Sequence, residues 1–414
     1  MPEALPVVVA NATIVDVACP EPRAGQHILM QDGRIKKISD NPIALAEATT
    51  IDVGGRYVMP GLIDSHVHVT AAHVSLGASA MLPDSYVALQ SASIMKGMLD
   101  RGFTTVRDLG GADHGLVRAI EEGVIDGPRL FMCGKALSQT GGHGDFRGRY
   151  DERPGAYYGR KLGSIARIAD GVEALRLACR EEIKSGATFI KLMANGGVAS
   201  PTDPIGFLGY SREEIAAAVE EAENAQTYVA AHLYTDQAIR RAVELGVKCV
   251  EHANLVEPPT AELMAKQGVY ACPTLITYDA LRRQGREFGF PEDSLLKIED
   301  VRERGFEAVR ILHEAGVKLL YGTDLLGPLH DHQAEGFMLM AKILSPTEII
   351  RSATSTPAEL LGMSGKIGCL SEGAYADMIV LAANPLEDIG VLSNTQETAL
   401  LVMKEGRIVK NRLH

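Results

Sequence analysis

The sequence predicts an α/β protein built as a (β/α)8 TIM barrel, with a small β-sandwich domain formed by both termini. Along the middle of the chain, eight apolar, β-branched runs alternate with longer helical patterns, which is typical of parallel βαβ units. Each end of the chain carries short strand-like segments with glycine turns. The expected domain limits are 1–57 and 366–414 for the two parts of the β-sandwich domain and 58–365 for the barrel.

Eight strand-like runs define the expected barrel, and each is bounded by turn residues. Helical stretches lie between them, such as those that begin at Arg212, Thr235 and Ala308, and each ends at or near a glycine or a polar cap. The runs are Tyr57–Ile63, Phe103–Leu109, Arg129–Gly134, Thr188–Met193, Thr227–Ala231, Val247–Glu251, Val269–Pro273 and Val317–Gly322.

The terminal segments are expected to form one domain together. Residues 6–55 have turns at Asp32-Gly33 and Gly54-Gly55, and residues 366–413 have turns near Gly373 and Gly406. Each segment is too short to bury a good core alone, so pairing between the two is the economical solution.

Composition excludes several classes of protein. Lys and Arg total 41 against 53 Asp and Glu, which gives a net charge of −12 and argues against nucleic-acid and anionic-membrane partners. No run approaches the ~18 apolar residues of a membrane span. No signal peptide is found at the start given, which predicts a cytoplasmic protein or a mature exported form. The six cysteines form no CxxC pair and are expected to be free thiols.

Chemistry in such a barrel is expected at the carboxyl ends of the strands. His66 and His68 follow the first run two residues apart, so both imidazoles project from one face of an extended chain. Neutral imidazoles suit Zn²⁺ and related divalent metals. Alternate polar residues on an exposed strand produce the same spacing, so this pair alone leaves both interpretations open.

Lys191 follows Phe189 and Ile190 and is expected to point into the barrel, where burial lowers its pKa. A neutral amine there can form a Schiff base, or can take up CO₂ to give a carbamate that bridges two metals. A lysine paired with a core carboxylate is the commoner alternative.

Three further polar residues end predicted strands. His232 and His252 close the fifth and sixth runs, and Asp324 follows the last one. A lone histidine in such a place is more often structural, but two in successive strands beside His66, His68 and Lys191 argue against coincidence. Asp324 can ligate a metal and accept a proton from water, or can simply cap the next helix.

Together these side chains converge on one barrel mouth, a pattern that resembles the amidohydrolase superfamily in its binuclear, carboxylated-lysine form. The segment GKIGCLSEGAYADMIVL is similar to that family's small domain, and the resemblance covers nearly the whole chain. The segments YVMPGLIDSHVHV, TTVRDLGG, GPRLFMCGKALSQTGGHG and IKLMANGGV resemble the imidazolonepropionase-related zinc dipeptidases, a branch that includes ochratoxin-degrading amidohydrolases.

The resemblance implies two Zn²⁺ or similar ions. His66, His68 and Asp324 would hold the more buried ion, His232 and His252 the more exposed one, and a carboxylated Lys191 formed from CO₂ would bridge them. A metal-bridged hydroxide would then attack the amide of a dipeptide or N-acyl amino acid, as in a dipeptidase or carboxypeptidase, ochratoxin A included. Relatives assemble as homo-oligomers, often octamers, and we expect the same here by analogy.

Two loop or strand residues are candidates for contacting substrate. His143, in the loop TGGHG after the third run, could donate a hydrogen bond to a substrate carboxylate or carbonyl. Tyr234 could stabilise the tetrahedral oxyanion through its hydroxyl. The alternative for each is a hydrogen bond to nearby backbone, which has equal weight for Tyr234 and less weight for His143. Arg147 and Arg149 are candidates for a carboxylate clamp, although loop arginines are more often solvated.

Two alternative functions remain open at this point. The same barrel could hydrolyse a cyclic amide or imidazolone, or deaminate a base; such enzymes commonly use one metal and lack the carboxylated lysine, so Lys191 weighs against them. A metal-free scaffold protein on this fold usually loses metal ligands, and here every position is filled.

Overall fold

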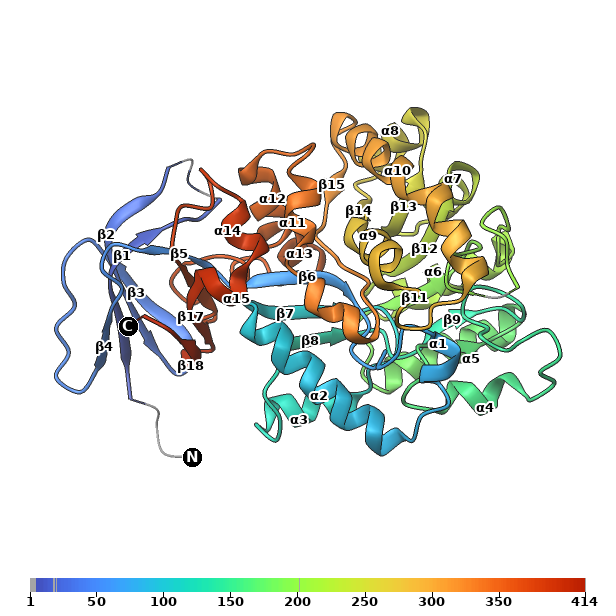
Figure 1. The fold of residues 1–414 in the computed structure, drawn as a ribbon, viewed down its shortest axis with the longest axis horizontal. Coiled ribbons are helices and arrows are strands. Elements are labelled where there is room, and N and C mark those ends of the chain that lie inside the picture. The colour runs from blue at the N-terminus through green and yellow to red at the C-terminus, as the bar shows by residue number, and fades with distance from the viewer. Residues whose placement is uncertain (1–4, 18, 20, 201, 414) are drawn as a thin grey trace. The chain divides into compact units, whose positions relative to one another are not determined.

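The computed structural model describes residues 5–17, 19, 21–200 and 202–413 (Figure 1). The chain forms two compact units. One consists of Met1–Asp64, Lys96–Val106 and Ala334–His414, and the other of Ser65–Met95 and Arg107–Gln333.

The first unit contains a sheet to which both ends of the chain contribute. Its strand order is β18-β17-β16-β5-β1-β2-β3, and β4 pairs with β1. The strands are β1 (Val7–Ile14), β2 (Arg23–Gln31), β3 (Arg34–Ser39), β4 (Thr49–Asp52), β5 (Tyr57–Pro60), β16 (Met378–Leu381), β17 (Ala399–Lys404) and β18 (Arg407–Asn411).

Two hairpin turns of this sheet lie where the sequence predicts them. Asp32-Gly33 joins β2 to β3 and Glu405-Gly406 joins β17 to β18, and all four residues have positive φ. That conformation matches the twist of the flanking strands, and glycine adopts it without steric cost. Residues from both termini, such as Ile28 and Met403, share one fully buried core.

Among the described residues, eight parallel strands form the barrel. They are β6 (Leu62–Val67), β7 (Phe103–Asp108), β8 (Arg129–Met132), β11 (Ile190–Met193), β12 (Val229–Thr235), β13 (Cys249–Leu255), β14 (Tyr270–Cys272) and β15 (Lys318–Leu319). Backbone hydrogen bonds close the ring, from Thr188 N to Met132 O (2.8 Å) and from Ser65 N to Tyr321 O (2.8 Å). The predicted fold class, a TIM barrel plus a β domain from both termini, is confirmed. The short strands β9 (Ala136–Ser138) and β10 (Ala166–Ile168) extend the sheet beside β11.

Helices cover the outside of these strands, as α7 on β12 and α10 on β13 illustrate (Figure 1). Ser211 and Glu214 form a capping box that starts α6, and Thr235 caps α7, so both helices begin where the sequence predicts. The helices of the second unit are α1 (Leu76–Ser79), α3 (His114–Glu121), α4 (Gly155–Gly159), α5 (Val172–Lys184), α6 (Arg212–Asn224), α7 (Asp236–Glu244), α8 (Pro258–Lys266), α9 (Leu275–Gln284), α10 (Glu292–Glu314) and the 3₁₀ helix η1 (Gly327–His332).

The remaining helices lie in the first unit or span both. They are α2 (Asp84–Asp100), α11 (Gly336–Met340), α12 (Pro346–Ser352), α13 (Ser355–Leu360), α14 (Gly390–Ser393) and α15 (Thr395–Thr398).

The predicted bounds of one strand and one helix were wrong. The run Tyr57–Ile63 is not one barrel strand: β5 pairs with β1 and β16 in the terminal sheet, and only β6, from Leu62, belongs to the barrel. Both pieces are buried and apolar, so hydropathy alone does not reveal the break between them. The helix predicted from Ala308 starts much earlier, at Glu292, directly after Pro291.

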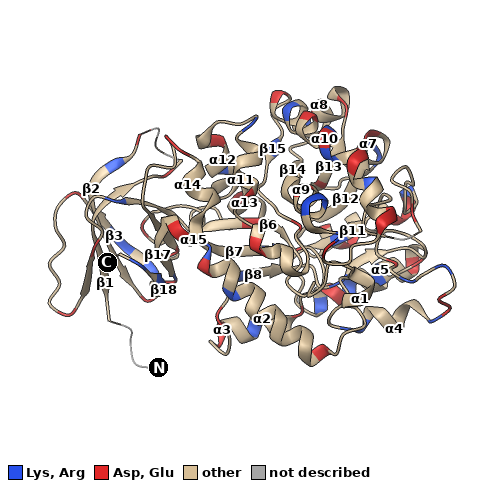
Figure 2. Ribbon diagram, viewed as in Figure 1, with Lys and Arg blue, Asp and Glu red and all other residues tan. Residues whose placement is uncertain are grey.

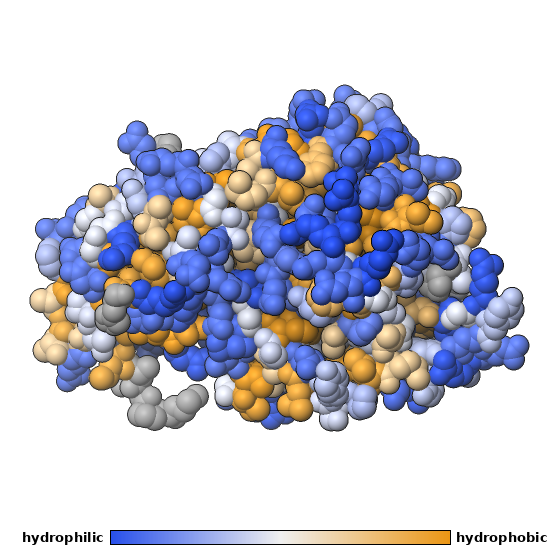
Figure 3. All heavy atoms as spheres, in the orientation of Figure 1, coloured by the Kyte–Doolittle hydropathy of each residue, from blue (hydrophilic) through white to orange (hydrophobic). Residues whose placement is uncertain are grey.

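Charged and apolar residues are interspersed on the face of the molecule that the figures draw. Acidic and basic residues are mixed along the helices (Figure 2), and hydrophilic residues cover most of that face, with small hydrophobic groups between them (Figure 3). Within the described part of the chain, no helix is long and apolar enough to cross a bilayer.

Candidate metal centre and substrate pocket

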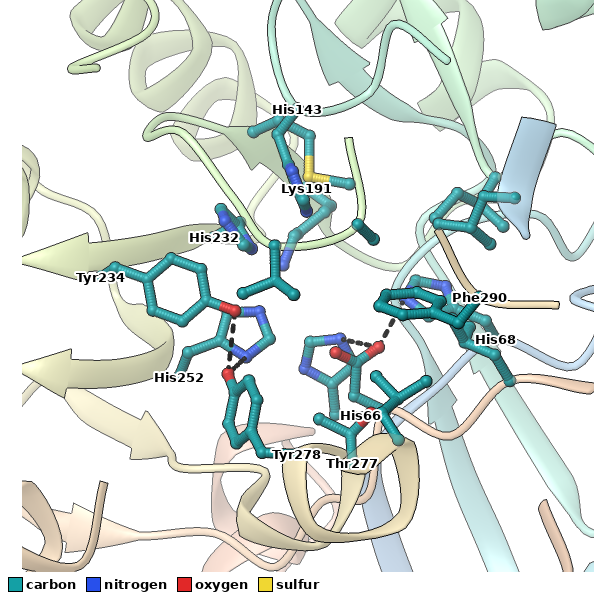
Figure 4. Close-up of a pocket in the computed structure, with 18 residues that line it drawn as sticks. His66, His68, His143, Lys191, His232, Tyr234, His252, Thr277, Tyr278 and Phe290 are labelled. Atoms are coloured by element: carbon teal, nitrogen blue, oxygen red, sulfur yellow. Dashed lines mark hydrogen bonds and ion pairs between the residues drawn. The ribbon is translucent and has the colours of Figure 1, made fainter. Parts of the chain in front are cut away.

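One pocket of the second unit gathers the six expected metal ligands and the two substrate candidates His143 and Tyr234 (Figure 4). They come from the ends of β6, β11, β12 and β13, from the segment after β15, and from the loop after β9. The eight residues are His66, His68, His143, Lys191, His232, Tyr234, His252 and Asp324.

His66 and His68 share a carboxylate neighbour. Their Nε2 atoms lie 3.4 Å and 3.2 Å from Oδ1 of Asp324. On the other side of each ring, Nδ1 of His66 is 2.8 Å from Oε2 of Glu251, and Nδ1 of His68 is 2.9 Å from the carbonyl of Gly110. Donation from Nδ1–H to these acceptors leaves both Nε2 atoms on the pocket side, the arrangement found for metal-ligating histidines.

His232 and His252 are held in the same manner. Nε2 of His232 lies 3.2 Å from the carbonyl of Gly196, which leaves Nδ1 toward the pocket, and Nδ1 of His252 lies 2.8 Å from Oγ1 of Thr274. The two rings are 4.6 Å apart. Burial, the largest effect, holds the pKa of each well below the ordinary histidine value, so both are neutral and able to bind a metal.

Lys191 lies among these groups with a side chain only 1% exposed (Figure 4). Burial lowers its pKa, although Glu251 and Asp324 oppose the shift. Among the described residues, its ammonium makes no hydrogen bond or ion pair, so the commoner alternative of a lysine paired to a core carboxylate does not describe it.

The donor set fits a divalent metal. Ligand atoms of His66, His252 and Asp324 lie within 4.8 Å of one another, and the pKa of Asp324 is lowered because His66 and His68 outweigh its burial. A carboxylate beside imidazoles is a donor set that Zn²⁺ and similar ions prefer. Within the described part of the chain, Lys191 adds a buried amine that has no hydrogen-bond or ion-pair partner beside these groups.

Below the pocket lies a buried ion pair that sequence reasoning missed. Arg107 on β7 donates to Oε1 of Glu251 (2.6 Å) and to the carbonyl of Ser65 (2.6 Å), and both charged side chains are at most 1% exposed. Glu251, His66 and Cys272 also have metal-ligand spacing, but the guanidinium already neutralises this carboxylate. Glu251 therefore orients His66 rather than binding an ion of its own.

Two tyrosines flank His252. The hydroxyls of Tyr234 and Tyr278 lie 2.9 Å apart, and that of Tyr278 is also 3.1 Å from Nδ1 of His252 (Figure 4). The Tyr278 hydroxyl also donates to Oδ1 of Asn254 (3.3 Å). The amide of Asn254 is fixed because its nitrogen donates to the carbonyl of Val301. Tyr278, on α9, thus sets the position of the Tyr234 hydroxyl at the edge of the pocket.

His143 lies with its ring stacked on His232 at 3.9 Å. Its Nδ1 is 2.7 Å from Oγ of Ser200 and 3.6 Å from Oδ2 of Asp203, so Nε2 is the atom left for a ligand. Arg147, in contrast, is held by Asp145 through two short bonds and is not available as a carboxylate clamp.

Strained backbone clusters at the strand ends around the pocket. His252, Thr274 and Asp324 have φ of 75°, 43° and 52°, a left-handed conformation that L-residues rarely adopt. Such strain costs roughly 1–3 kcal/mol per residue and persists where the surrounding structure imposes it, most often at functional sites. Gly322, which follows β15, packs closely against both neighbouring strands, since a Cβ there would lie 2.2 Å from Sγ of Cys272 on β14 and 2.8 Å from Cβ of His66 on β6.

Comparison with known proteins agrees with this geometry. A family model described as the amidohydrolase family matches residues 57–409. An ochratoxinase of Aspergillus niger is 33% identical over 368 residues, which cover 85% of this chain and 75% of the relative.

Solved structures give the same result over almost the entire chain. A prolidase complexed with N-methylphosphonate-L-proline has a TM-score of 0.96 at 48% identity, covering 98% of this chain and 100% of that one. A Xaa-Pro dipeptidase with bound methionine has a TM-score of 0.86 at 27% identity, covering 97% and 99%. The A. niger ochratoxinase structure has a TM-score of 0.86 at 29% identity, covering 99% and 96%.

Proposed function

The chain belongs to the amidohydrolase family and is a hydrolase of amide C–N bonds, and we propose that it works with two divalent metal ions, Zn²⁺ in the first instance, on dipeptides and N-acyl amino acids. His66, His68 and Asp324 would hold one ion and His232 and His252 the other. Lys191, carboxylated by CO₂, would bridge them.

The observation that supports this proposal best is the orientation of four buried imidazoles. In each ring one nitrogen is occupied by a partner outside the pocket, and the other faces the space that Lys191 and Asp324 also face. When bound, ions of this kind polarise a carbonyl oxygen and supply a nucleophile at neutral pH.

The protein's own groups have distinct tasks in the hydrolysis. The carboxylate of Asp324, ionised because its pKa is lowered, would take a proton from the attacking water and pass it to the nitrogen of the leaving amine. The hydroxyl of Tyr234 can donate to the oxyanion that develops on the former carbonyl. Nε2 of His143 can bind the substrate's carboxylate or carbonyl oxygen.

The rest of the pocket suits an apolar substrate. Its other lining residues include Leu76, Ile165, Phe290 and Leu326, and within the described lining no carboxylate besides Asp324 is present to hold a substrate ammonium. N-acyl amino acids are therefore accommodated as well as free dipeptides. The prolidase, Xaa-Pro dipeptidase and ochratoxinase relatives indicate which amides to try first, namely Xaa-Pro dipeptides, N-acyl prolines and ochratoxin A.

Screening the metal-loaded protein tests this proposal. The panel consists of Xaa-Pro dipeptides, N-acyl amino acids and ochratoxin A, with cyclic amides and aminopurines as the alternative classes. We expect release of a free amino acid from apolar acyl compounds. Hydrolysis of cyclic amides alone, or deamination of the aminopurines, would contradict the proposed substrate class.

A further inference from the structure

Lys297, on α10, reaches the segment that follows β11. Its ammonium donates to three backbone carbonyls, those of Gly197 (3.0 Å), Ser200 (3.0 Å) and Asp203 (3.2 Å). About a hundred residues separate donor and acceptors in the sequence. A charged donor with three carbonyl acceptors is a strong attachment for a segment whose described residues belong to no helix or strand.

The attached residues are those that hold His143. Oγ of Ser200 is 2.7 Å from its Nδ1, and Oδ2 of Asp203, which is 2% exposed, accepts from the amide of Gly197 (3.0 Å). Gly197 itself lies against the imidazole, since a Cβ there would be 2.0 Å from its Cε1 and Nδ1. The position of the His143 ring thus depends on this stretch of backbone.

The same stretch also lines the pocket, through Val198 and Ala199. We propose that Lys297 is a positioning residue for substrate binding, because it fixes this backbone so that Nε2 of His143 and the apolar wall meet the substrate together. The proposal rests on the proposed function in one respect, that His143 contacts the amide substrate.

Replacing Lys297 by Met keeps the length of the side chain and removes the donor. In the metal-loaded full-length protein we expect KM for the best acyl amino acid to rise about tenfold, with kcat and bound metal nearly unchanged, because substrate binding is affected and the metal ligands are not. Lys297→Arg, which keeps a donor at the site, should restore most of the lost affinity.

Lys248→Met is the matched control. Lys248 also donates to a backbone carbonyl, that of Gln267 (3.2 Å), but it precedes β13, at the end of the strand opposite to His252. Its replacement should leave KM as it is. An unchanged KM in Lys297→Met, or an equal rise in the control, would overturn the proposal, and so would a loss confined to kcat and metal content.

Amide hydrogen exchange separates failure of this inference from failure of the proposed function. Faster exchange in the peptide that carries Gly197, Ser200 and Asp203, in Lys297→Met but not in Lys248→Met, supports the attachment even if none of the tested amides is cleaved. Unchanged exchange in that peptide contradicts it whatever the substrate is.

Discussion

The pocket has a floor and a wall that are built in different ways. The floor is the strand-borne set of Arg107, Glu251 and His66, in which every side chain is at most 2% exposed and two charges pair directly. The wall is the set of loop residues around His143. Their positions depend on the hydrogen bonds that Lys297, a half-buried residue of α10, donates to backbone carbonyls. The proposed metal ligands thus lie on strands or directly follow them, and the proposed substrate contact of His143 depends on a segment fixed at few points.

This difference predicts two kinds of mutational effect. A buried ion pair gains little net stability while intact, but removing one partner leaves an uncompensated charge and costs about 3–5 kcal/mol. A partly exposed hydrogen bond to a loop is worth about 0.5–1.5 kcal/mol. Changes in the floor should therefore alter metal binding and stability, whereas changes in the wall should alter substrate binding alone.

The largest effect is expected from Lys191→Ala. It removes the proposed bridging ligand between the two metal positions, so activity and metal occupancy should be lost together. Metal analysis and a hydrolysis assay on the same preparation measure both. Full activity with a bound metal pair would eliminate the carbamate.

Tyr234→Phe tests whether the Tyr234 hydroxyl donates to the oxyanion that develops on the substrate carbonyl. Loss of the hydroxyl should lower kcat by about 10²–10³-fold, the usual effect of removing an oxyanion donor, with metal content unchanged. Tyr278→Phe, which removes the neighbouring hydroxyl 2.9 Å away, should have a smaller effect. Equal kcat in wild type and Tyr234→Phe would remove Tyr234 from the mechanism.

Glu251→Gln removes the negative charge from the floor with little change in the shape of the side chain. Arg107 loses its anionic partner, and His66 its charged acceptor, so metal affinity should fall about 10–100-fold. The free energy of unfolding in urea should fall as well. Glu244→Gln is the control, because Glu244 is 41% exposed and its pair with Arg212, at 3.6 Å, lies at the surface. Identical behaviour of the two variants would show that the floor does not act on the metal.

Ser200→Ala should have the smallest effect. It removes the hydrogen bond to Nδ1 of His143 while Asp203 and Lys297 stay in place. We expect KM to rise about threefold, within the range for one neutral hydrogen bond, with no change in metal content. Steady-state kinetics and metal analysis of one preparation measure both quantities. An unchanged KM with a reduced metal content would show that Ser200 acts on the metal site and not on substrate binding.

The sequence predicted the fold and the strand-borne residues because both follow from periodicity. Strand ends of a barrel meet at one mouth, so His66, Lys191 and His232 were found by their place after apolar runs. The break between β5 and β6 was not found, because both sides of it are apolar and buried.

Other members of the site were missed for two different reasons. Arg107 and Glu251 are opposite charges inside buried runs, and buried charges are almost always paired, so that signal was present in the sequence. Ser200, Asp203 and Tyr278 carry no such signal. Their contacts with His143 and His252 join residues 26, 57 and 60 positions apart in the sequence, and only the folded chain brings them together.

Counting metal ions in the purified protein tests the central claim most directly. Elemental analysis of protein expressed with added Zn²⁺ should give two divalent ions per chain, together with hydrolysis of an N-acyl amino acid or Xaa-Pro dipeptide. One ion per chain in the fully active protein, or activity that survives complete removal of metal, would contradict a binuclear amide hydrolase.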